Sequence, residues 1–463
     1  MESLTDLSCV ELAAAIRARH ATCVAATEAT LARAHAVQPK LNCFLRIDDD
    51  SALAAAHLAD KEIARGYVRG PLHGVPMAHK DMYYRRGVVS TCGSRILRET
   101  PAAGTAKVLE LLDAAGAIQF GVLNMAEFAM GPTGHNWHYG HCRNPWNTER
   151  ITGGSSSGSG ASVAARANFA ALGSDTGGSV RLPAALCGIS GVRPTHGLVS
   201  VENILPLCPT LDTVGPLTRT VEDAALILEV IAQRAFPLKS VKGLRIGRPR
   251  QLFFDGCDSE ITAAMDASLE VFRRLGATVT DIDLPDLSAW TAAGAVVHAA
   301  EANPFHDEWF RTRPQDYSPQ VRERLEKGRP VLALDYVKAM QARAPAIAAF
   351  CEAVFTKVDL VHGPVVSFRT PTIVETDIST GEAAAQMLGR FVRLTRPISY
   401  LGLPVVAANA GFTRDGMPIG MQLIAPPFAE ATALSAGHAF QRATDWHVRA
   451  PRQELRHLPG SLR

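Results

Sequence analysis

The sequence predicts a single α/β domain, in which a central mixed β-sheet is covered on both faces by helices. The amphipathic segment 106–117 leads directly into the apolar run 118–123, and a helix followed by a strand recurs along the chain. Hydrophobic residues make up 47% and charged residues 20% of the chain, as in ordinary globular proteins. No linker, repeat or low-complexity tract divides the 463 residues, so we expect one domain over 1–463.

The first 65 residues are predicted to be helical. Ser8 and Glu11 form the capping-box pattern in front of a short amphipathic run. Thr22 can cap a second helix, and 50–64 is typical of a third. We therefore expect a helical region over 1–65 ahead of the sheet.

The part from 66 to 240 is expected to form the core. Residues 72–80 alternate in polarity and predict a strand that ends at Lys80. Gly116 can end the helix over 106–117, which the strand 118–123 follows. A helical run is predicted over 161–169. Another is predicted over 220–233, where Glu222 and Asp223 suit the positive end of the helix dipole.

The C-terminal half is predicted to add further strands and a variable helical region. Residues 285–350 are charged and irregularly helical, within a region 285–400 that carries no readable motif. Arg414-Asp415-Gly416 predicts a hairpin turn between two strands. The predicted strands are 244–247, 278–282, 359–366, 404–412 and 419–424, and a closing helix covers 430–443.

Charge and cysteine usage exclude several classes of partner. The net charge is only +2, so we expect neither nucleic acid nor an anionic membrane as a partner. No stretch reaches the ~18 apolar residues of a membrane-spanning helix, and the N-terminus lacks the pattern of a signal peptide. The nine cysteines are scattered singly, which favours reduced thiols in a cytoplasmic protein.

A Gly/Ser-rich stretch from 152 to 194 contains two Gly-Gly-Ser turns, 153–155 and 177–179. Glycine permits sharp turns and lets a ligand approach the main chain. A serine after such a pair is presented outward on the bend. The backbone N–H groups of Thr176, Gly177, Gly178 and Ser179 can then converge on one point, as in an oxyanion hole.

A flexible linker and a phosphate-binding loop fit this stretch less well. A flexible linker would lack the helical run 161–169 and the apolar residues after it. A phosphate-binding loop would need a lysine after the glycines, or an acidic residue at the spacing of a dinucleotide site, and the stretch has no such lysine.

Several motifs together resemble one known family. The stretch 152–194 is similar to the sequence that names the amidase signature family of serine hydrolases. The match continues through 74–81, 124–131, 143–146, 402–404 and 416–424, and so covers nearly the whole chain. The resemblance implies the α/β fold described above, hydrolysis of a carbon–nitrogen bond, no cofactor and no metal. The resemblance also implies that 285–400 is the variable region that shapes the substrate pocket. It is specific for the family and says little about the substrate.

The resemblance also implies a catalytic relay of two serines and a lysine. Ser179 would attack the carbonyl, Ser155 would pass the proton, and Lys80 would be the base, with a cis peptide bond before Ser155. Histidine is the more common base, but none of His79, His135, His138, His141 and His196 lies in a known nucleophile motif. A basic lysine must be neutral, which requires burial to lower its pKa from about 10.4.

Other residues are expected to support this site. Asp175 and Arg181 flank the nucleophile turn and would brace it as an ion pair. Met125, Met130, Gly131 and His138 are candidates for substrate binding, as parts of segments that lie between motifs. Three histidines in 135–141 could suggest zinc, but flanking glycines predict a loop and no carboxylate or cysteine completes a ligand set, so we expect no metal.

The sequence therefore predicts an amidase that acts on a small-molecule amide or carbamate through an acyl-enzyme. The family resemblance adds a homodimer as an expected assembly. A carbamate, biuret or urea-type hydrolase remains an alternative, as does a non-catalytic binding protein on the same scaffold. A further alternative is an amidotransferase subunit that works on charged tRNA. The lack of a basic tract and the presence of Ala126, where that subgroup often carries an acid, speak against it.

Overall fold

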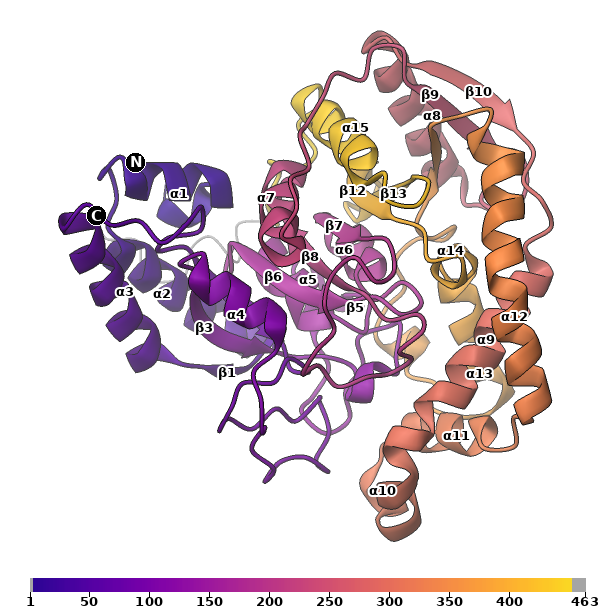
Figure 1. Ribbon diagram of the computed structural model, residues 1–463, viewed down its shortest axis with the longest axis horizontal. Helices are drawn as coiled ribbons and strands as arrows, with labels where there is room; N and C mark the ends of the chain where they lie inside the picture. Colours follow the sequence, from indigo (N-terminus) through magenta and orange to yellow (C-terminus); the bar gives the residue numbers. More distant parts are fainter. Residues whose placement is uncertain (1–2, 452–463) are drawn as a thin grey trace.

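An 11-stranded mixed sheet forms the centre of the protein (Figure 1). The structure is a computed structural model that describes residues 3–451. The strands follow one another across the sheet in the order β1-β3-β2-β6-β8-β7-β12-β13-β11-β9-β10, and β4 and β5 form a separate two-stranded sheet. The strands are β1 (Phe44–Ile47), β2 (Pro76–Lys80), β3 (Ile118–Leu123), β4 (Arg143–Asn144), β5 (Asn147–Ile151), β6 (Ala170–Ser174), β7 (Ser190–Arg193), β8 (Val214–Thr218), β9 (Arg245–Pro249), β10 (Thr278–Ile282), β11 (Leu360–Pro364), β12 (Val405–Phe412) and β13 (Pro418–Ile424).

Parallel and antiparallel pairs alternate in blocks across this sheet. Strand β2 runs parallel to both β3 and β6, and β9 runs parallel to both β10 and β11. Between these blocks, β8, β7, β12 and β13 pair in antiparallel fashion. Every residue of β2, β6, β8 and β13 is buried, as expected for strands that are covered on both faces.

Helices pack on the two faces of the sheet and confirm the predicted α/β fold. Helices α7, α8 and α15 contact the sheet through β7, β8 and β10–β13, while α5 and α6 contact it through β2, β6–β8, β12 and β13. The helices are α1 (Cys9–Arg17), α2 (Cys23–Leu41), α3 (Asp49–Ala64), α4 (Lys107–Ala114), α5 (Ser157–Ala164), α6 (Arg181–Cys187), α7 (Val221–Ala232), α8 (Ser259–Arg274), α9 (Ser288–Ala302), α10 (Asp307–Thr312), α11 (Pro319–Gly328), α12 (Ala333–Phe350), α13 (Gly381–Val392), α14 (Arg396–Tyr400) and α15 (Glu430–Arg442).

Helices α9 to α13 form a separate layer on one side of the molecule, on the right in Figure 1. Within this layer α9 is central, because it packs against α11, α12 and α14. The chain enters the layer after the edge strand β10 and returns to the sheet at β11 and β12. The predicted helical region 285–350 is thus built as an insertion beside the sheet.

Helix caps agree with the sequence predictions, whereas several short strands, β1 and β6 among them, were missed. Ser8 and Glu11 make the reciprocal capping-box hydrogen bonds, and the Thr22 and Thr220 side chains cap α2 and α7.

The predicted helical run 161–169 was wrong in its extent: α5 ends at Ala164, and β6 begins at Ala170. Alanine-rich segments favour helix by intrinsic propensity. Strand β6 nevertheless forms, because β2 and β8 supply hydrogen-bond partners on its two sides. Strand β1 is too short to show a period.

No helix in residues 3–451 is both long enough and apolar enough to cross a membrane.

Close contact of Gly215 in β8 with the neighbouring strand gives a test of the sheet. A Cβ at Gly215 would lie 1.8 Å from the carbonyl oxygen of Val192, so the two central strands would have to separate. We expect Gly215→Ala to lower the free energy of unfolding by about 3 kcal/mol or more. Gly389→Ala is the matched control, because a Cβ there meets no atom within 4 Å on exposed α13. It should be neutral or stabilising by up to about 1 kcal/mol. Denaturant midpoints measure both; equal midpoints would contradict the register of β7 and β8.

Candidate active site

Lys80 lies at the point where two parallel strands end. It is the last residue of β2, and Ser174 is the last residue of the parallel neighbour β6. Carboxyl ends of parallel strands meet at one edge of a sheet, where ligand sites commonly form. The Lys80 Nζ donates hydrogen bonds to Ser174 Oγ at 2.8 Å and to Ser155 Oγ at 2.7 Å, and its side chain is fully buried. The structure therefore brings Lys80 and Ser155 together, as expected.

Ser174 was not predicted to belong to the site. The strand that carries Ser174 was not predicted, and only the parallel pairing of β6 with β2 brings this serine close to Lys80.

The loop before α5 brings Ser155 to the lysine. The Gly154–Ser155 peptide bond is cis, as the family resemblance implies. The two residues before Ser155 are both suited only to glycine. Gly153 has a φ of +76°, and a Cβ on Gly154 would lie 2.4 Å from the carbonyl oxygen of Gly131. The first Gly-Gly pair thus allows the backbone to pass close to the 131–134 loop.

Burial brings Lys80 close to neutrality. Loss of hydration lowers the pKa of the Lys80 ammonium to about 7, although the nearby carboxylates of Asp212 and Asp175 act in the opposite direction. Asp212 is itself buried, which raises its pKa to about 6. Its carboxylate accepts hydrogen bonds from Thr176 Oγ1 and from the backbone N–H groups of Leu207 and Cys208.

Asp212 stands outside every motif that was recognised in the sequence, on the segment between the second Gly-Gly-Ser turn and β8. Only the fold shows that this carboxylate acts on Lys80 and holds Thr176. We therefore add Asp212 to the residues of the candidate site.

Ser179 opens into a cavity. It is partly exposed, whereas Lys80 and Ser155 are fully buried. With Thr176 and Gly177 it lines a cavity of about 250 Å³. Within residues 3–451, Ser179 Oγ makes no hydrogen bond to Ser155 or to Lys80. Ser179 thus lies where a ligand can reach it. The hydrogen bond between Ser179 and Ser155 that the predicted relay requires is not formed between these two described residues.

The turn around Ser179 presents three free backbone N–H groups rather than four. Gly178 donates its N–H to Asp175 Oδ1 at 2.9 Å, so the prediction that it points at a ligand was wrong. In the described part of the chain, the N–H groups of Thr176, Gly177 and Ser179 have no hydrogen-bond acceptor. These three groups can still converge on an oxyanion.

Asp175 braces this turn with two arginines. Its carboxylate lies 3.0 Å from Arg181 Nη2 and 2.9 Å from Arg193 Nη1, and all three side chains are fully buried. Although burial alone would raise it, the two guanidinium groups hold the pKa of Asp175 well below its usual range. The predicted pair of Asp175 and Arg181 is present. Arg193 at the end of β7 was missed, because no local spacing links it to the turn.

Two of the four residues expected to bind substrate line the cavity. Met130 and Gly131 do so. Met125 is buried away from it, and its carbonyl oxygen accepts a hydrogen bond from Asn136. His138 contacts Glu127 at 2.7 Å instead, and neither side chain lies in the cavity wall. The geometry therefore does not support binding roles for Met125 and His138.

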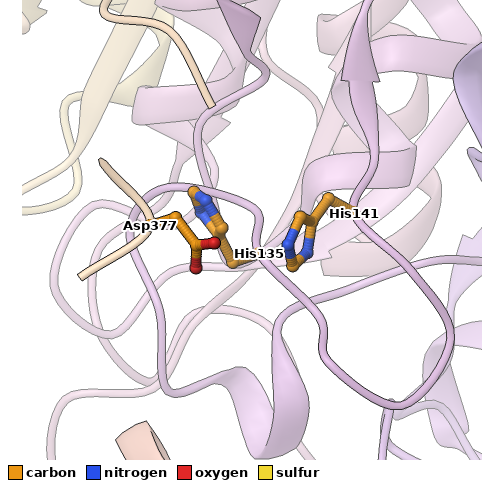
Figure 2. Close-up of side chains that lie close together, drawn as sticks. All are labelled: His135, His141 and Asp377. Carbon is orange, nitrogen blue, oxygen red and sulfur yellow. The ribbon is translucent and has the colours of Figure 1, made fainter. Parts of the chain in front are cut away.

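The histidine run places His135 and His141 near the carboxylate of Asp377, which the sequence pattern did not link to them (Figure 2). One potential ligand atom from each lies within 4.8 Å of the others. His141 Nδ1 accepts the backbone N–H of Asn136, so a neutral His141 carries its proton on Nε2. A metal-binding histidine needs the opposite arrangement, with one nitrogen free and the other donating. Both ring nitrogens of His135 also have protein partners. This chemistry does not favour a metal, and a site without metal stays a prediction.

The remaining walls of the cavity come from the helical layer. Helices α9, α11 and α13 line it, together with the first residue of α14. The residues around Ser179 supply polar backbone groups, while most of the helical wall is alanine, leucine and glycine. A mostly apolar cleft with a few convergent polar groups is typical of an enzyme site.

Fold and site together define an enzyme that acts on the carbon–nitrogen bond of an amide. The chain matches the Amidase family over residues 25–434 and belongs to that family. It is similar to a glutamyl-tRNA(Gln) amidotransferase subunit of Chloroflexus aurantiacus, with 38% identity over 98% of this chain and 99% of that protein.

Solved structures agree with this assignment. A crystal structure of an amidase has a TM-score of 0.87 and 32% identity, covering 94% of this chain and 99% of that chain. The corresponding glutamyl-tRNA(Gln) amidotransferase subunit from Thermotoga maritima has a TM-score of 0.75 and 27% identity, covering 95% of both chains. Both similarities extend over nearly the whole length.

These relatives correct one prediction. We expected a small-molecule substrate and no nucleic acid, on the basis of the near-neutral charge. The similar proteins are named as subunits of an amidotransferase for glutamyl-tRNA(Gln), which contradicts that expectation. The net charge of a single chain is a weak guide, because a protein of several subunits can contact nucleic acid through only some of them.

The contribution of the buried ion cluster of Asp175, Arg181 and Arg193 to stability can be tested by removing one arginine. Arg193→Met leaves Asp175 with one guanidinium in a dry environment, and we expect the free energy of unfolding to fall by about 3–5 kcal/mol. Arg85→Met is the control, because Arg85 pairs with Asp113 at the partly exposed surface, where a pair contributes about 0–1 kcal/mol. Chemical denaturation measures both. If both variants lost the same free energy of unfolding, the result would contradict the expectation that burial makes loss of an arginine from the cluster more costly.

Proposed function

We propose that this chain cleaves an amide through an acyl-enzyme on Ser179 and works as the amide-cleaving subunit of an amidotransferase assembly. The observation that carries the chemistry is the 2.7 Å contact between a nearly neutral Lys80 and Ser155, beside a serine that opens into a cavity. The similarity to amidotransferase subunits over almost the full length supports the assembly.

The geometry supports a relay in which each proton has a defined acceptor. Neutral Lys80 takes the proton of Ser155, which takes that of Ser179 as Ser179 Oγ bonds to the amide carbon. The free N–H groups of Thr176, Gly177 and Ser179 stabilise the oxyanion. When the C–N bond breaks, the proton returns from Lys80 through Ser155 to the leaving nitrogen. Water then attacks the carbonyl carbon of the acyl-enzyme and gives its proton through Ser155 to Lys80, and Ser179 Oγ leaves and takes up that proton by the same route. The relay requires the Ser179 and Ser155 hydroxyl groups to come within hydrogen-bond distance in the substrate complex.

In the assembly, the released nitrogen is passed to an acceptor. An amidotransferase for glutamyl-tRNA(Gln) must obtain nitrogen from an amide and exchange it for an oxygen of the glutamyl carboxyl group, which a phosphoryl donor such as ATP has to activate first so that phosphate can leave. Cleavage at Ser179 would supply that nitrogen, and other subunits would hold the tRNA.

The nucleophile is tested by labelling with a fluorophosphonate. We expect wild type to be labelled, and Ser179→Ala to lose both the label and ammonia release from amides, about 10³-fold or more. Ser155→Ala and Lys80→Ala should be labelled much more slowly. Ser162→Ala is the control, because Ser162 lies in α5 and donates its hydroxyl hydrogen to the carbonyl oxygen of Ser159, away from the cavity. Unchanged labelling of Ser179→Ala would sink the proposed nucleophile.

The base is tested by the pH dependence of activity. A neutral Lys80 is required, so kcat/KM should rise with pH through about 7 and then level. Asp212→Asn removes a negative charge that favours the ammonium form, which lowers the pKa of Lys80. The rising limb should therefore move to lower pH. Asp283→Asn, on the exposed surface, is the control. A limb that stays in place or moves to higher pH would contradict the role of Asp212.

The assembly is tested by purification at native expression level. We expect a tagged chain to bring down stoichiometric partner chains, and the complex to convert glutamyl-tRNA(Gln) to glutaminyl-tRNA(Gln) when an amide donor and ATP, as the phosphoryl donor that activates the carboxyl group, are present. The complex that carries Ser179→Ala should lose conversion with an amide donor but keep it with ammonia. A chain that purifies alone and supports no conversion would remove the assembly from the proposal.

A further inference from the structure

A carboxylate of the helical layer contacts the loop in front of β8. Glu301 lies on α9, and it accepts hydrogen bonds from the Tyr336 hydroxyl on α12 at 2.9 Å and from the backbone N–H of Thr210 at 3.0 Å. The Thr210 hydroxyl and the Cys208 thiol donate to the same carboxylate, the thiol at 3.2 Å. Each oxygen of Glu301 thus accepts two of these hydrogen bonds, and the loop supplies three of the four donors.

This loop, residues 207–212, also carries Asp212. The Asp212 carboxylate accepts the backbone N–H groups of Leu207 and Cys208, each at 2.9 Å. The carbonyl oxygen of Cys208 in turn accepts the N–H group of Asp212 at 2.8 Å. Cys208 is therefore bound by Glu301 through its thiol and by Asp212 through its backbone, so a displacement of the loop at Cys208 also displaces Asp212.

Two further side chains hold the same loop from the side of the sheet. Arg193 Nη2 donates to the carbonyl oxygen of Leu211 at 3.0 Å, and His196 Nε2 lies 3.1 Å from the carbonyl oxygen of Pro209. Among these anchors Glu301 is the one that the helical layer supplies. The titratable groups that face Glu301 from the surrounding elements are Cys208, His196, Tyr336 and Arg343.

Glu301 joins two parts of the cavity wall. Helix α9 lines the cavity that Ser179 opens into, and Leu207 and Leu211 of the loop line it as well. Hydrogen bonds to an ionised carboxylate are roughly twice as strong as those between neutral groups. A shift of α9 relative to the sheet is therefore passed to the loop.

We propose that Glu301 is a positioning residue that keeps the Asp212 carboxylate in place beside Lys80, and so controls the electrostatic environment of the base from the helical layer. This inference rests on the proposed function, because it names a regulator of the same relay. The titratable groups that act on Lys80 are Asp212, Asp175 and Cys92, and Glu301 acts on Lys80 through the first of these.

The pH dependence of fluorophosphonate labelling tests this role. Glu301→Ala releases the loop, so the Asp212 carboxylate moves away from Lys80 and favours its ammonium form less. The rising limb of the labelling rate should therefore move to lower pH, by about 0.5–1 pH unit. In the Asp212→Asn background, Glu301→Ala should move the limb by less than about 0.2 pH unit, because its effect passes through Asp212. Glu308→Ala, on the exposed surface of α10, is the matched control.

Residue-resolved hydrogen exchange tests the contact itself without any turnover. The amides of Leu207 and Cys208 are the reporters, because Asp212 rather than Glu301 accepts their hydrogen bonds. We expect Glu301→Ala to speed their exchange about tenfold or more, and Glu301→Gln, which keeps the size of the side chain, about threefold. The amides of α7 should exchange as in wild type. If Glu301→Ala speeds exchange in α7 too, the protein has lost structure generally, and Glu301→Gln decides.

Two results would overturn the proposal. One is exchange of the Leu207 and Cys208 amides at the wild-type rate in both Glu301 variants. The other is a limb that stays in place, or that moves equally in the wild-type and Asp212→Asn backgrounds, as a direct effect of the Glu301 charge would give. Failure of the proposed function is recognised separately, by the absence of labelling in the wild-type protein. In that case the exchange rates still decide whether Glu301 holds Asp212.

Discussion

The buried carboxylate of Asp175 is the constraint on which the candidate site depends. It holds Arg181 and Arg193, and it also accepts the backbone N–H groups of Gly178, Val180 and Arg181. These contacts fix the turn from both sides, so that the neighbouring N–H groups and Ser179 face the cavity. A buried charge with this many partners is stabilised only in one geometry, because any displacement leaves it unpaired.

Two opposing effects set the pKa of Lys80. Burial disfavours the ammonium form, while the carboxylates of Asp212 and Asp175 favour it. The two effects leave the lysine near the midpoint of its titration at neutral pH, where a base can both accept and return a proton. Asp212 also accepts a hydrogen bond from the Thr176 side chain, so one residue links the charge of Lys80 to the shape of the turn.

Much of the fold and part of the site could be predicted from the sequence, for physical reasons that differ between residues. The helices with clear caps, such as α1 and α7, and the buried strand β3 were recognised because their signals are local. Lys80, Ser155 and Asp175 came from motifs. The motifs did not identify three further residues, Arg193, Asp212 and Ser174. These residues lie outside the motifs, and only the pairing of strands and the path of a loop bring them close to the motif residues. The hydrogen bond from Gly178 to Asp175 likewise depends on the folded turn.

The helices α9 to α12 enter the chain between β10 and β11, apart in sequence from β2, β6 and the turn around Ser179. Part of the cavity wall therefore lies on a stretch of the polypeptide that is separate from Lys80, Ser155 and Ser179. Insertions, deletions or exchanges in 285–358 can remodel what fits the cavity while the buried charges around Asp175 stay in place. Part of the substrate cavity can thus change through one segment of the chain while the proposed cleavage machinery keeps its sequence.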